Sequence, residues 1–140
     1  MREILFRGKR TDNGNWIEGS LIVGRDLDSG DLIYLIAPLS AFYTEIKKVM
    51  PESASEFTGL TDKNGKKIFE GDIVYSDDLY AEPLLVIFNE NRGEFQVLFS
   101  DGYSEGFLEQ YTPICHLKVI GNIHDKPELL RTPQNDEVRE

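Results

Sequence analysis

The sequence predicts a mainly β protein with little helix, and three observations support that class. Its apolar residues gather in short segments rich in Ile, Val, Leu, Phe and Tyr. Gly, Asn, Asp and Pro separate many of these segments, which is typical of turns between strands. Phe95, Val97 and Phe99 alternate with polar residues, as in a half-buried strand. The expected strands are Glu3–Phe6, Trp16–Val23, Asp31–Ala37, Asp72–Tyr75, Leu84–Phe88, Glu94–Phe99 and Leu117–Ile123.

Two neighbouring segments carry more detailed expectations. Leu84–Phe88 is apolar at every position, which predicts a strand covered on both faces. Asn89–Gly93 then predicts a tight hairpin with a glycine available for positive φ. Helix is expected only as one or two turns at Ser40–Met50, Ser53–Phe57 and Ser104–Gln110, and as a short helix at Pro127–Leu130, where proline suits the first position.

Composition excludes several classes of protein. Hydrophobic residues make up 40% of the 140 residues and charged residues 29%, as in a soluble globular chain. The longest apolar run falls far short of the roughly 20 residues that cross a bilayer, so we expect no membrane association. Acidic and basic residues near Met1 argue against a secretory leader, and the single cysteine excludes an internal disulfide framework. A cytoplasmic protein is expected.

The charge is strongly and unevenly negative. Lys and Arg total 15 against 25 Asp and Glu, for a net charge of −10. Residues 1–58 hold 7 bases and 9 acids, whereas residues 59–140 hold 8 bases and 16 acids. Since nucleic-acid affinity comes largely from Lys and Arg on phosphates, this balance disfavours a nucleic-acid partner. Three small basic groups form either a local anion-binding patch or scattered solvated side chains: Arg7/Lys9/Arg10, Lys47/Lys48 and Lys63/Lys66/Lys67.

An internal repeat links the two halves of the chain. Thr11–Ile22 resembles Thr61–Val74, with an Asn-Gly turn, an apolar pair, Glu-Gly and an apolar strand in each copy. The Asn-Gly pair predicts a type I′ hairpin, and the Gly of Glu-Gly permits a bend or bulge. Either the chain holds two related β units, or the likeness arose by chance between two turn-and-strand segments.

Three blocks of sequence resemble the YopX family of phage and prophage proteins. Phe57–Val74, with its Glu70-Gly71-Asp72 centre, is the most specific of them. Ile4–Arg10 and Val119–Leu130 fit the family as well, so the resemblance spans nearly the whole chain.

The resemblance implies an SH3-like β-barrel in the C-terminal part and a bacterial or bacteriophage setting. About five strand candidates follow Asp72 with short connections, which suits a small barrel. We therefore expect a smaller related β unit at residues 1–57, the SH3-like barrel at residues 58–124 and a C-terminal tail at residues 125–140. The family implies no reaction, so it supplies no catalytic residues and no cofactor.

No other motif predicts an enzyme or a metal site. Cys115 and His116 are adjacent, so on a strand they point to opposite faces and do not suit one metal ion. Glu70 and Asp72 would share one face, where paired carboxylates can serve acid–base chemistry or bind a hard cation. Because Glu18 matches Glu70 in the repeat, the favoured role is structural, with the carboxylate accepting hydrogen bonds from backbone N–H groups.

The expected interaction surface combines tyrosines with acids in the second half of the chain. Tyrosines near loops are favoured at protein interfaces, and SH3-like barrels bind peptides through aromatic grooves with acidic rims. The alternative is that the rings close the ends of the barrel. The candidate interaction residues are Tyr75, Tyr80, Tyr103, Tyr111, Asp77, Asp78 and Glu105.

The leading hypothesis is a non-enzymatic, phage-derived β-barrel module that binds a protein, either a second copy in a homo-oligomer or another polypeptide. Its acidic residues favour a basic partner, or imitate DNA phosphates toward a DNA-binding protein. The alternative is a nucleic-acid accessory protein that uses the basic groups near Arg7 and Lys63. A hydrolase or metal-dependent enzyme is a third hypothesis, and it needs Glu70, Asp72 and His124 to converge.

Overall fold

The structure is a computed structural model that describes residues 3–39, 45–76, 80–106 and 117–130. Within these ranges, eleven strands in two antiparallel sheets confirm the mainly β class. The chain divides into two compact units, Met1–Phe57 and Thr58–Glu140.

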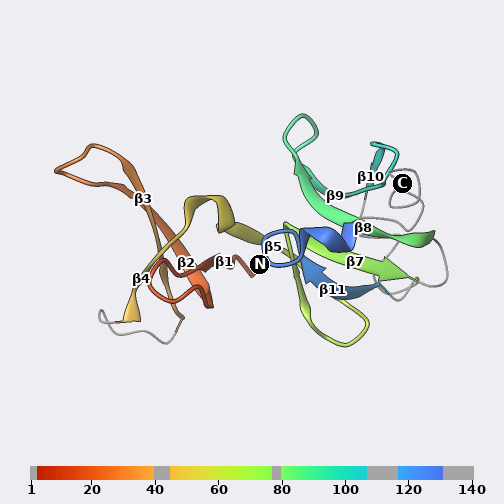
Figure 1. Cartoon of the computed structure of the whole chain (residues 1–140), viewed down its shortest axis with the longest axis horizontal. Helices are drawn as coiled ribbons and strands as arrows, with labels where there is room; N and C mark the ends of the chain where they lie inside the picture. The colour runs from red at the N-terminus through yellow and green to blue at the C-terminus, as the bar shows by residue number, and fades with distance from the viewer. Residues whose placement is uncertain (1–2, 40–44, 77–79, 107–116, 131–140) are drawn as a thin grey trace. The chain divides into compact units, whose positions relative to one another are not determined.

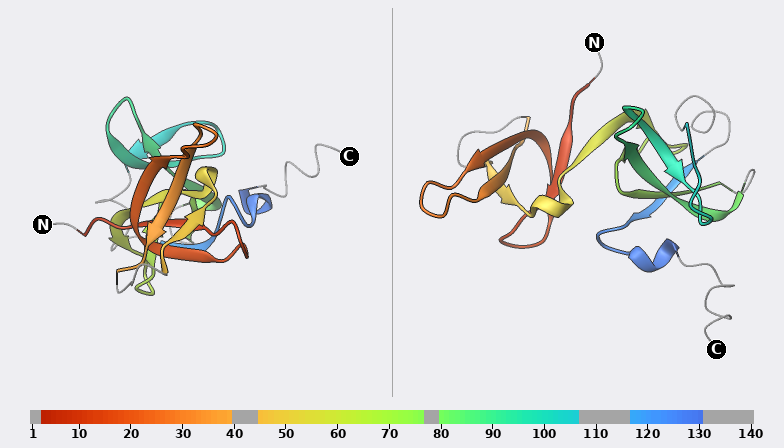
Figure 2. Two further views of the ribbon diagram at one scale, coloured as in Figure 1. Left: turned by 90° about the vertical axis from the view of Figure 1, so that its left-hand side faces the viewer. Right: turned by 90° about the horizontal axis from the view of Figure 1, so that it is seen from above.

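The first unit is a curled antiparallel sheet with the strand order β4-β3-β2-β1-β5 (Figure 1). Its long hairpin, β2 with β3, is the most extended element of this unit (Figure 2). A bridge between Arg10 and Val49 brings the end of β1 to β4, and the Met50 N–H donates to the Lys9 carbonyl there. Ile36 and Val49 are fully buried inside the curl. The strands are β1 (Phe6–Lys9), β2 (Trp16–Arg25), β3 (Leu32–Ala37), β4 (Lys47–Val49) and β5 (Ser55–Thr61).

The second unit is built on a five-stranded sheet with the order β10-β9-β8-β7-β11. The later residues of β5 lie beside β6, whose Ile68 packs onto this sheet. The strands are β6 (Lys67–Phe69), β7 (Asp72–Ser76), β8 (Tyr80–Asn89), β9 (Glu94–Leu98), β10 (Ser104–Gly106) and β11 (Lys118–Asn122). The buried core is Ile68, Val74, Leu84, Val86, Phe95, Val97, Leu117 and Val119. The described strands form no closed barrel, so the SH3-like barrel stays a prediction.

The described parts of three expected helical ranges are mostly strand. Lys47–Val49, Ser55–Phe57 and Ser104–Gly106 are strands, because β4 pairs with β3, β5 with β1 and β10 with β9. Only Glu45 and Ser53 of the described residues in these ranges have 3-10 geometry. The rest of two of those ranges, residues 40–44 and 107–110, lies outside the described residues. Such pairing overrides weak local helix preference.

Neither Asn-Gly pair takes the two central positions of a type I′ turn, which was the expectation. The Gly14 N–H donates to the Arg10 carbonyl, four residues back, at 3.0 Å, and the Gly65 N–H donates to the Asp62 carbonyl, three residues back, at 3.0 Å. Asn-Gly therefore occupies the last two positions of a five-residue turn in the first copy and of a four-residue turn in the second. Beyond it the copies diverge, because β2 runs straight through Glu18-Gly19 whereas the chain turns at Glu70-Gly71, between β6 and β7.

The turn at Asn89–Gly93 and the short helix near the end of the chain are confirmed. Gly93 has φ 66° and donates to the Asn89 carbonyl at 2.7 Å. Pro127–Leu130 forms a 3-10 turn, η3, that packs against β8. Its Leu129 lies so close to Gly121 of β11 that a Cβ there would be 2.6 Å from the leucine. The start of the expected tail is thus part of the second unit.

Candidate functional site

Four of the seven candidate interaction residues lie at one end of the five-stranded sheet. Since strands alternate in direction, the β7–β8 and β9–β10 connections lie at the same end. Tyr75 is half-buried on β7, and Tyr103 is 73% exposed just before β10. Tyr80 and Glu105 lie on β8 and β10, where the structure describes only their backbone. The remaining three, Asp77, Asp78 and Tyr111, lie outside the described residues, as do Cys115 and His116.

The acid and histidine candidates meet at the opposite end of the same sheet, around the turn between β6 and β7. Asp72 is 1% exposed, and its Oδ2 accepts the Phe69 N–H at 2.8 Å. The His124 ring lies over Gly71, with Nε2 3.2 Å from where a Cβ would stand. Glu70, between Phe69 and Gly71, is half-buried. These groups share one corner, but the Asp72 carboxylate closes the turn by accepting a backbone N–H, a structural role of the kind expected; for Glu70 that role stays a prediction.

Within the described ranges, no group of three or more His, Cys, Asp or Glu residues is arranged to hold a metal ion.

Asp62 is a second buried carboxylate with a structural role, and sequence analysis did not single it out. It is 6% exposed; Oδ1 accepts the Asn64 and Lys66 N–H groups, and Oδ2 accepts the Val119 N–H at 3.0 Å. Burial by itself raises the pKa of this carboxyl, but the three backbone N–H donors outweigh it, so the pKa is lowered. Asp62 therefore ties the turn after β5 to β11.

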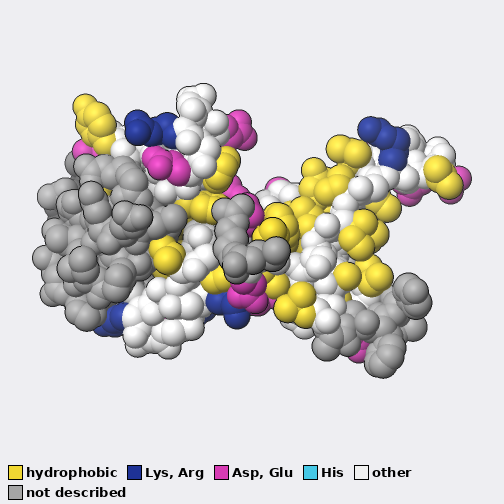
Figure 3. Space-filling view, turned by 180° about the vertical axis from the view of Figure 1, so that it is seen from behind, with side chains coloured by type: hydrophobic (Ala, Val, Ile, Leu, Met, Phe, Trp, Pro, Cys, Tyr) yellow, Lys and Arg dark blue, Asp and Glu magenta, His cyan; other side chains and the backbone are white. Residues whose placement is uncertain are grey.

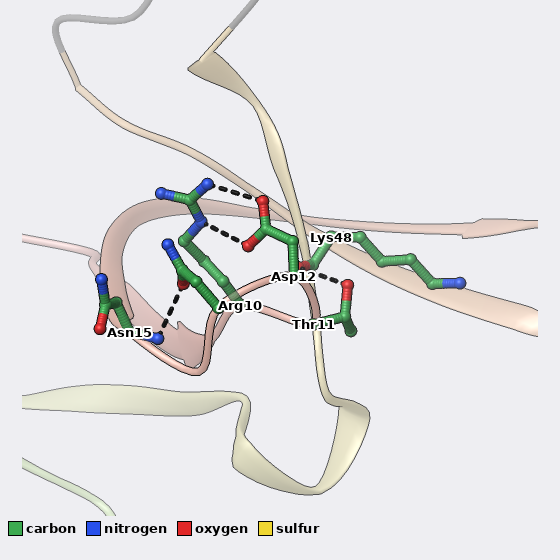
Figure 4. A network of polar contacts seen from close by, with 6 residues as sticks. Arg10, Thr11, Asp12, Asn15 and Lys48 are labelled. Carbon is green, nitrogen blue, oxygen red and sulfur yellow. Dashed lines mark hydrogen bonds and ion pairs between the residues drawn. The ribbon is translucent and has the colours of Figure 1, made fainter.

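The basic residues of the first unit are largely engaged within the unit. Arg10 and Asp12 form a bidentate ion pair, with Nε–Oδ1 at 2.9 Å and Nη2–Oδ2 at 2.7 Å (Figure 4). These hydrogen bonds lower the pKa of the Asp12 carboxyl. In the same view the Thr11 hydroxyl donates to the Lys48 carbonyl at 3.5 Å. The Lys48 side chain extends away from the Arg10–Asp12 pair.

Two more of these cations, Arg7 and Lys9, lie over the ring of Trp16. The Arg7 guanidinium lies 4.7 Å from the centre of the Trp16 ring, and the Lys9 ammonium lies 5.9 Å from it. Arg7 is only 8% exposed, and its Nε donates to Ser55 Oγ at 3.4 Å. An aromatic face attracts such cations through its quadrupole. Arg7, Lys9 and Arg10 therefore each contact a side chain of the first unit, Trp16 or Asp12.

Among the described residues, several exposed apolar side chains lie on the outer part of the β2–β3 hairpin, residues 22–33, which we call the β-arm. Ile22, Val23 and Leu32 are 41%, 50% and 49% exposed, and Leu27 at the tip is 99% exposed. Ile22 faces one side of the hairpin, while Val23 and Leu32 face the other. Hydrophobic side chains gather over this unit in the space-filling view (Figure 3). Large exposed apolar patches often mark interaction surfaces, so the β-arm is a candidate for one.

Sequence analysis missed the β-arm, although a signal was available. Leu32–Ala37 is apolar at every position and pairs with the run Leu21-Ile22-Val23. The rule applied to Leu84–Phe88, that such a strand needs cover on both faces, applies equally to this hairpin. In β8 that expectation holds only in part: Leu84 and Val86 are buried on one face, whereas Leu85 and Ile87 on the other face are only half-buried.

Comparison with known proteins identifies the family. The YopX protein family model matches residues 5–131, so the chain belongs to the YopX family. The chain is also similar to a solved structure, the crystal structure of protein EF1440 from Enterococcus faecalis. The two share 25% sequence identity with a TM-score of 0.52, over 94% of this chain and 100% of that chain. No curated protein sequence matches at a significant level.

The described parts of the chain contain no helix long and apolar enough to span a membrane.

Proposed function

We propose that this chain is a non-enzymatic protein-interaction module whose contact surface is the β-arm. One observation carries the proposal: a two-stranded ribbon exposes Ile22 on one face and Val23 and Leu32 on the other. Apolar side chains in this setting gain free energy when a partner removes them from water, at roughly 25 cal/mol per Å² buried. The tyrosines at the β7–β8 end of the second unit form a second, smaller contact surface.

The family and the composition supply the setting of the proposal. In it, the second unit is an SH3-like barrel, and the protein is phage or prophage encoded and acts in the bacterial cytoplasm. The Asp72 and Asp62 carboxylates support a non-enzymatic role, because both accept backbone N–H groups and stabilise turns.

The nucleic-acid alternative draws less support. Arg7 packs on Trp16 and Arg10 pairs with Asp12, so two of the cations expected to meet phosphates are engaged. The third group, Lys63/Lys66/Lys67, belongs to the strongly acidic second half of the sequence. A protein partner remains the better match to an apolar surface.

The test compares two isoleucine variants. Immobilised wild-type chain, Ile22→Lys and Ile4→Lys are each exposed to a bacterial lysate and to the purified wild-type chain. Ile4 is 59% exposed in the same unit but outside the β-arm, so it is a matched control. We expect Ile22→Lys to lose bound polypeptides that the wild type and Ile4→Lys retain.

Equal capture by all three proteins, or no capture by any of them, would contradict the proposal. Fluorescence anisotropy with labelled oligonucleotides is measured in parallel. Salt-dependent binding at micromolar protein would favour the nucleic-acid alternative instead.

A further inference from the structure

The β-arm extends beyond the strands that support its base. β1 pairs with β2 only as far as Gly19, and β4 pairs with β3 only over Tyr34–Ile36. Past those points, in the described part of the first unit, β2 and β3 are paired with each other alone, through Gly24↔Ile33 and Arg25↔Leu32. A two-stranded ribbon is at best marginally stable by itself in water. A partner that covers its apolar residues would therefore also stabilise it.

Charge is distributed unevenly along the hairpin. The tip carries three acids, Asp26, Asp28 and Asp31, next to Arg25, whose Nη1 donates to the Gly30 carbonyl at 2.6 Å. The base carries Lys47 and Lys48 on β4, opposite Ile36 and Leu35 of β3. Leu32 and Ile36 are four residues apart on β3, so about 13 Å of strand separates tip from base. Along the length of the hairpin, the surface is thus acidic at the tip, apolar in the middle and basic at the base.

One acid of the tip, Asp26, is held in its charged form. Asp26 Oδ1 accepts the N–H groups of Asp28 and Ser29, at 2.8 and 3.2 Å. These two hydrogen bonds lower the pKa of the Asp26 carboxyl, and attraction to Lys48 adds to the effect. Asp28 and Asp31 are exposed. Positive charge on β4 is therefore already favourable to the tip within one chain.

An acidic–apolar–basic surface is complementary to itself when a second copy is turned end for end. We propose that two copies of this chain associate through antiparallel β-arms, each acidic tip against the partner's Lys47 and Lys48. The apolar residues around Ile22 and Val23 then meet their equivalents near the two-fold axis, as in other isologous interfaces. This rests on the proposed function and names its partner.

The near balance of charge in the first half of the chain suits such a contact. Residues 1–58 hold 7 bases and 9 acids, whereas residues 59–140 hold 8 and 16. Two copies that meet through the β-arm bring together their least charged halves, so the repulsion between two chains of net charge −10 is smallest there.

Charge exchange between two variants tests the proposal. One variant reverses the tip (Asp28→Lys with Asp31→Lys), and the other reverses the base (Lys47→Glu with Lys48→Glu). Sedimentation equilibrium of the full chain, from micromolar to near-millimolar protein at low and high salt, measures association. Lys63→Glu with Lys126→Glu, exposed positions of the second unit, controls for net charge. Circular dichroism checks that each variant is folded.

We expect a wild-type dimer that weakens with salt, two variants that each dissociate at least about tenfold more readily, and a dimer in their equimolar mixture. The control should associate nearly as the wild type does. Ile22→Lys should also dissociate more readily than Ile4→Lys, which gives a test that is independent of the charge exchange.

A wild type that is monomeric throughout, or a mixture that stays monomeric, overturns the proposal. The wild type could instead be monomeric while Ile22→Lys fails to capture a different polypeptide that Ile4→Lys retains. The proposed function would then stand, and the partner of the β-arm would be another protein. If Ile22→Lys changes neither association nor capture, both proposals fail.

Discussion

The two units of this chain bury their apolar residues to very different extents. In the second unit, eight hydrophobic side chains from β6, β7, β8, β9, β11 and the residue before β11 form one buried cluster. In the first unit, Ile36 and Val49 are fully buried at the base of the hairpin, whereas Ile22, Val23 and Leu32 of the β-arm are about half exposed. Similar residues in similar strands are thus packed into a core in one unit and left exposed in the other, where we propose that they contact a partner.

The largest expected contrast is between two leucines. Leu84 is 1% exposed in the core of the second unit, and Leu32 is 49% exposed on the β-arm. Leu84→Ala should lower the free energy of unfolding by about 2–5 kcal/mol, because it removes buried contacts and leaves a cavity. Leu32→Ala should change it by about 0.5 kcal/mol or less at low protein concentration. Urea unfolding measures both, and equal losses would remove the distinction between core and β-arm.

Two glycines of β2 sharpen the comparison within the first unit. A Cβ at Gly19 would collide with the Ala37 carbonyl at the packed base, whereas one at Gly24 would meet only Ile33, at 3.9 Å. Gly19→Ala should therefore destabilise the protein by about 1–3 kcal/mol, since backbone must move to make room. Gly24→Ala should be neutral or slightly stabilising. Thermal unfolding of the two variants provides the measurement, and a tolerated Gly19→Ala would mean that the base is as open as the β-arm.

The last comparison is between two carboxylates, Asp62, which is buried in the second unit, and Asp12, which is exposed in the first. Asp62→Asn puts an amide NH₂ among backbone N–H donors and should cost about 1–3 kcal/mol. Asp12→Asn breaks only the exposed pair with Arg10, so a much smaller change is expected.

The pH dependence of stability provides a second readout for Asp62. Its pKa is lowered by folding, so its contribution is fully present above the ordinary Asp value of about 4 and is lost as the pH falls through the folded value. Acid titration of the free energy of unfolding should be shallower in Asp62→Asn than in the wild type below about pH 4. Identical acid profiles would show that the three backbone N–H bonds do not distinguish the folded from the unfolded carboxyl.

Several features were predictable because their causes are local. The alternation around Val97 and the punctuation by Asn, Asp and Gly correctly predict strands and turns, since both depend on neighbours in sequence. The place of Asn64-Gly65 at the end of its turn, and not at the centre, was not predictable in the same way. There the Asp62 carboxylate accepts N–H groups inside the turn and also the Val119 N–H, 57 residues away.

The candidate surface shows the same division. Tyrosines and acids are conspicuous in the sequence, but the sequence does not reveal which apolar strand is left uncovered. Leu84–Phe88 and Leu32–Ala37 look equivalent as strings of residues. They differ because β8 lies between β7 and β9 against a filled core, while the outer part of β3 has β2 as its only neighbour among the described strands.

By itself, the amino-acid order determined the β class, the places where the chain reverses and the membership of the YopX family. The tertiary structure decided which hydrophobic strands are covered, which carboxylates hold turns and which cations are engaged. The physical reason is the separation along the sequence over which each interaction acts. Strand and turn preferences act over a few neighbouring residues, whereas burial, hydrogen bonding and charge pairing depend on partners that only folding brings within reach.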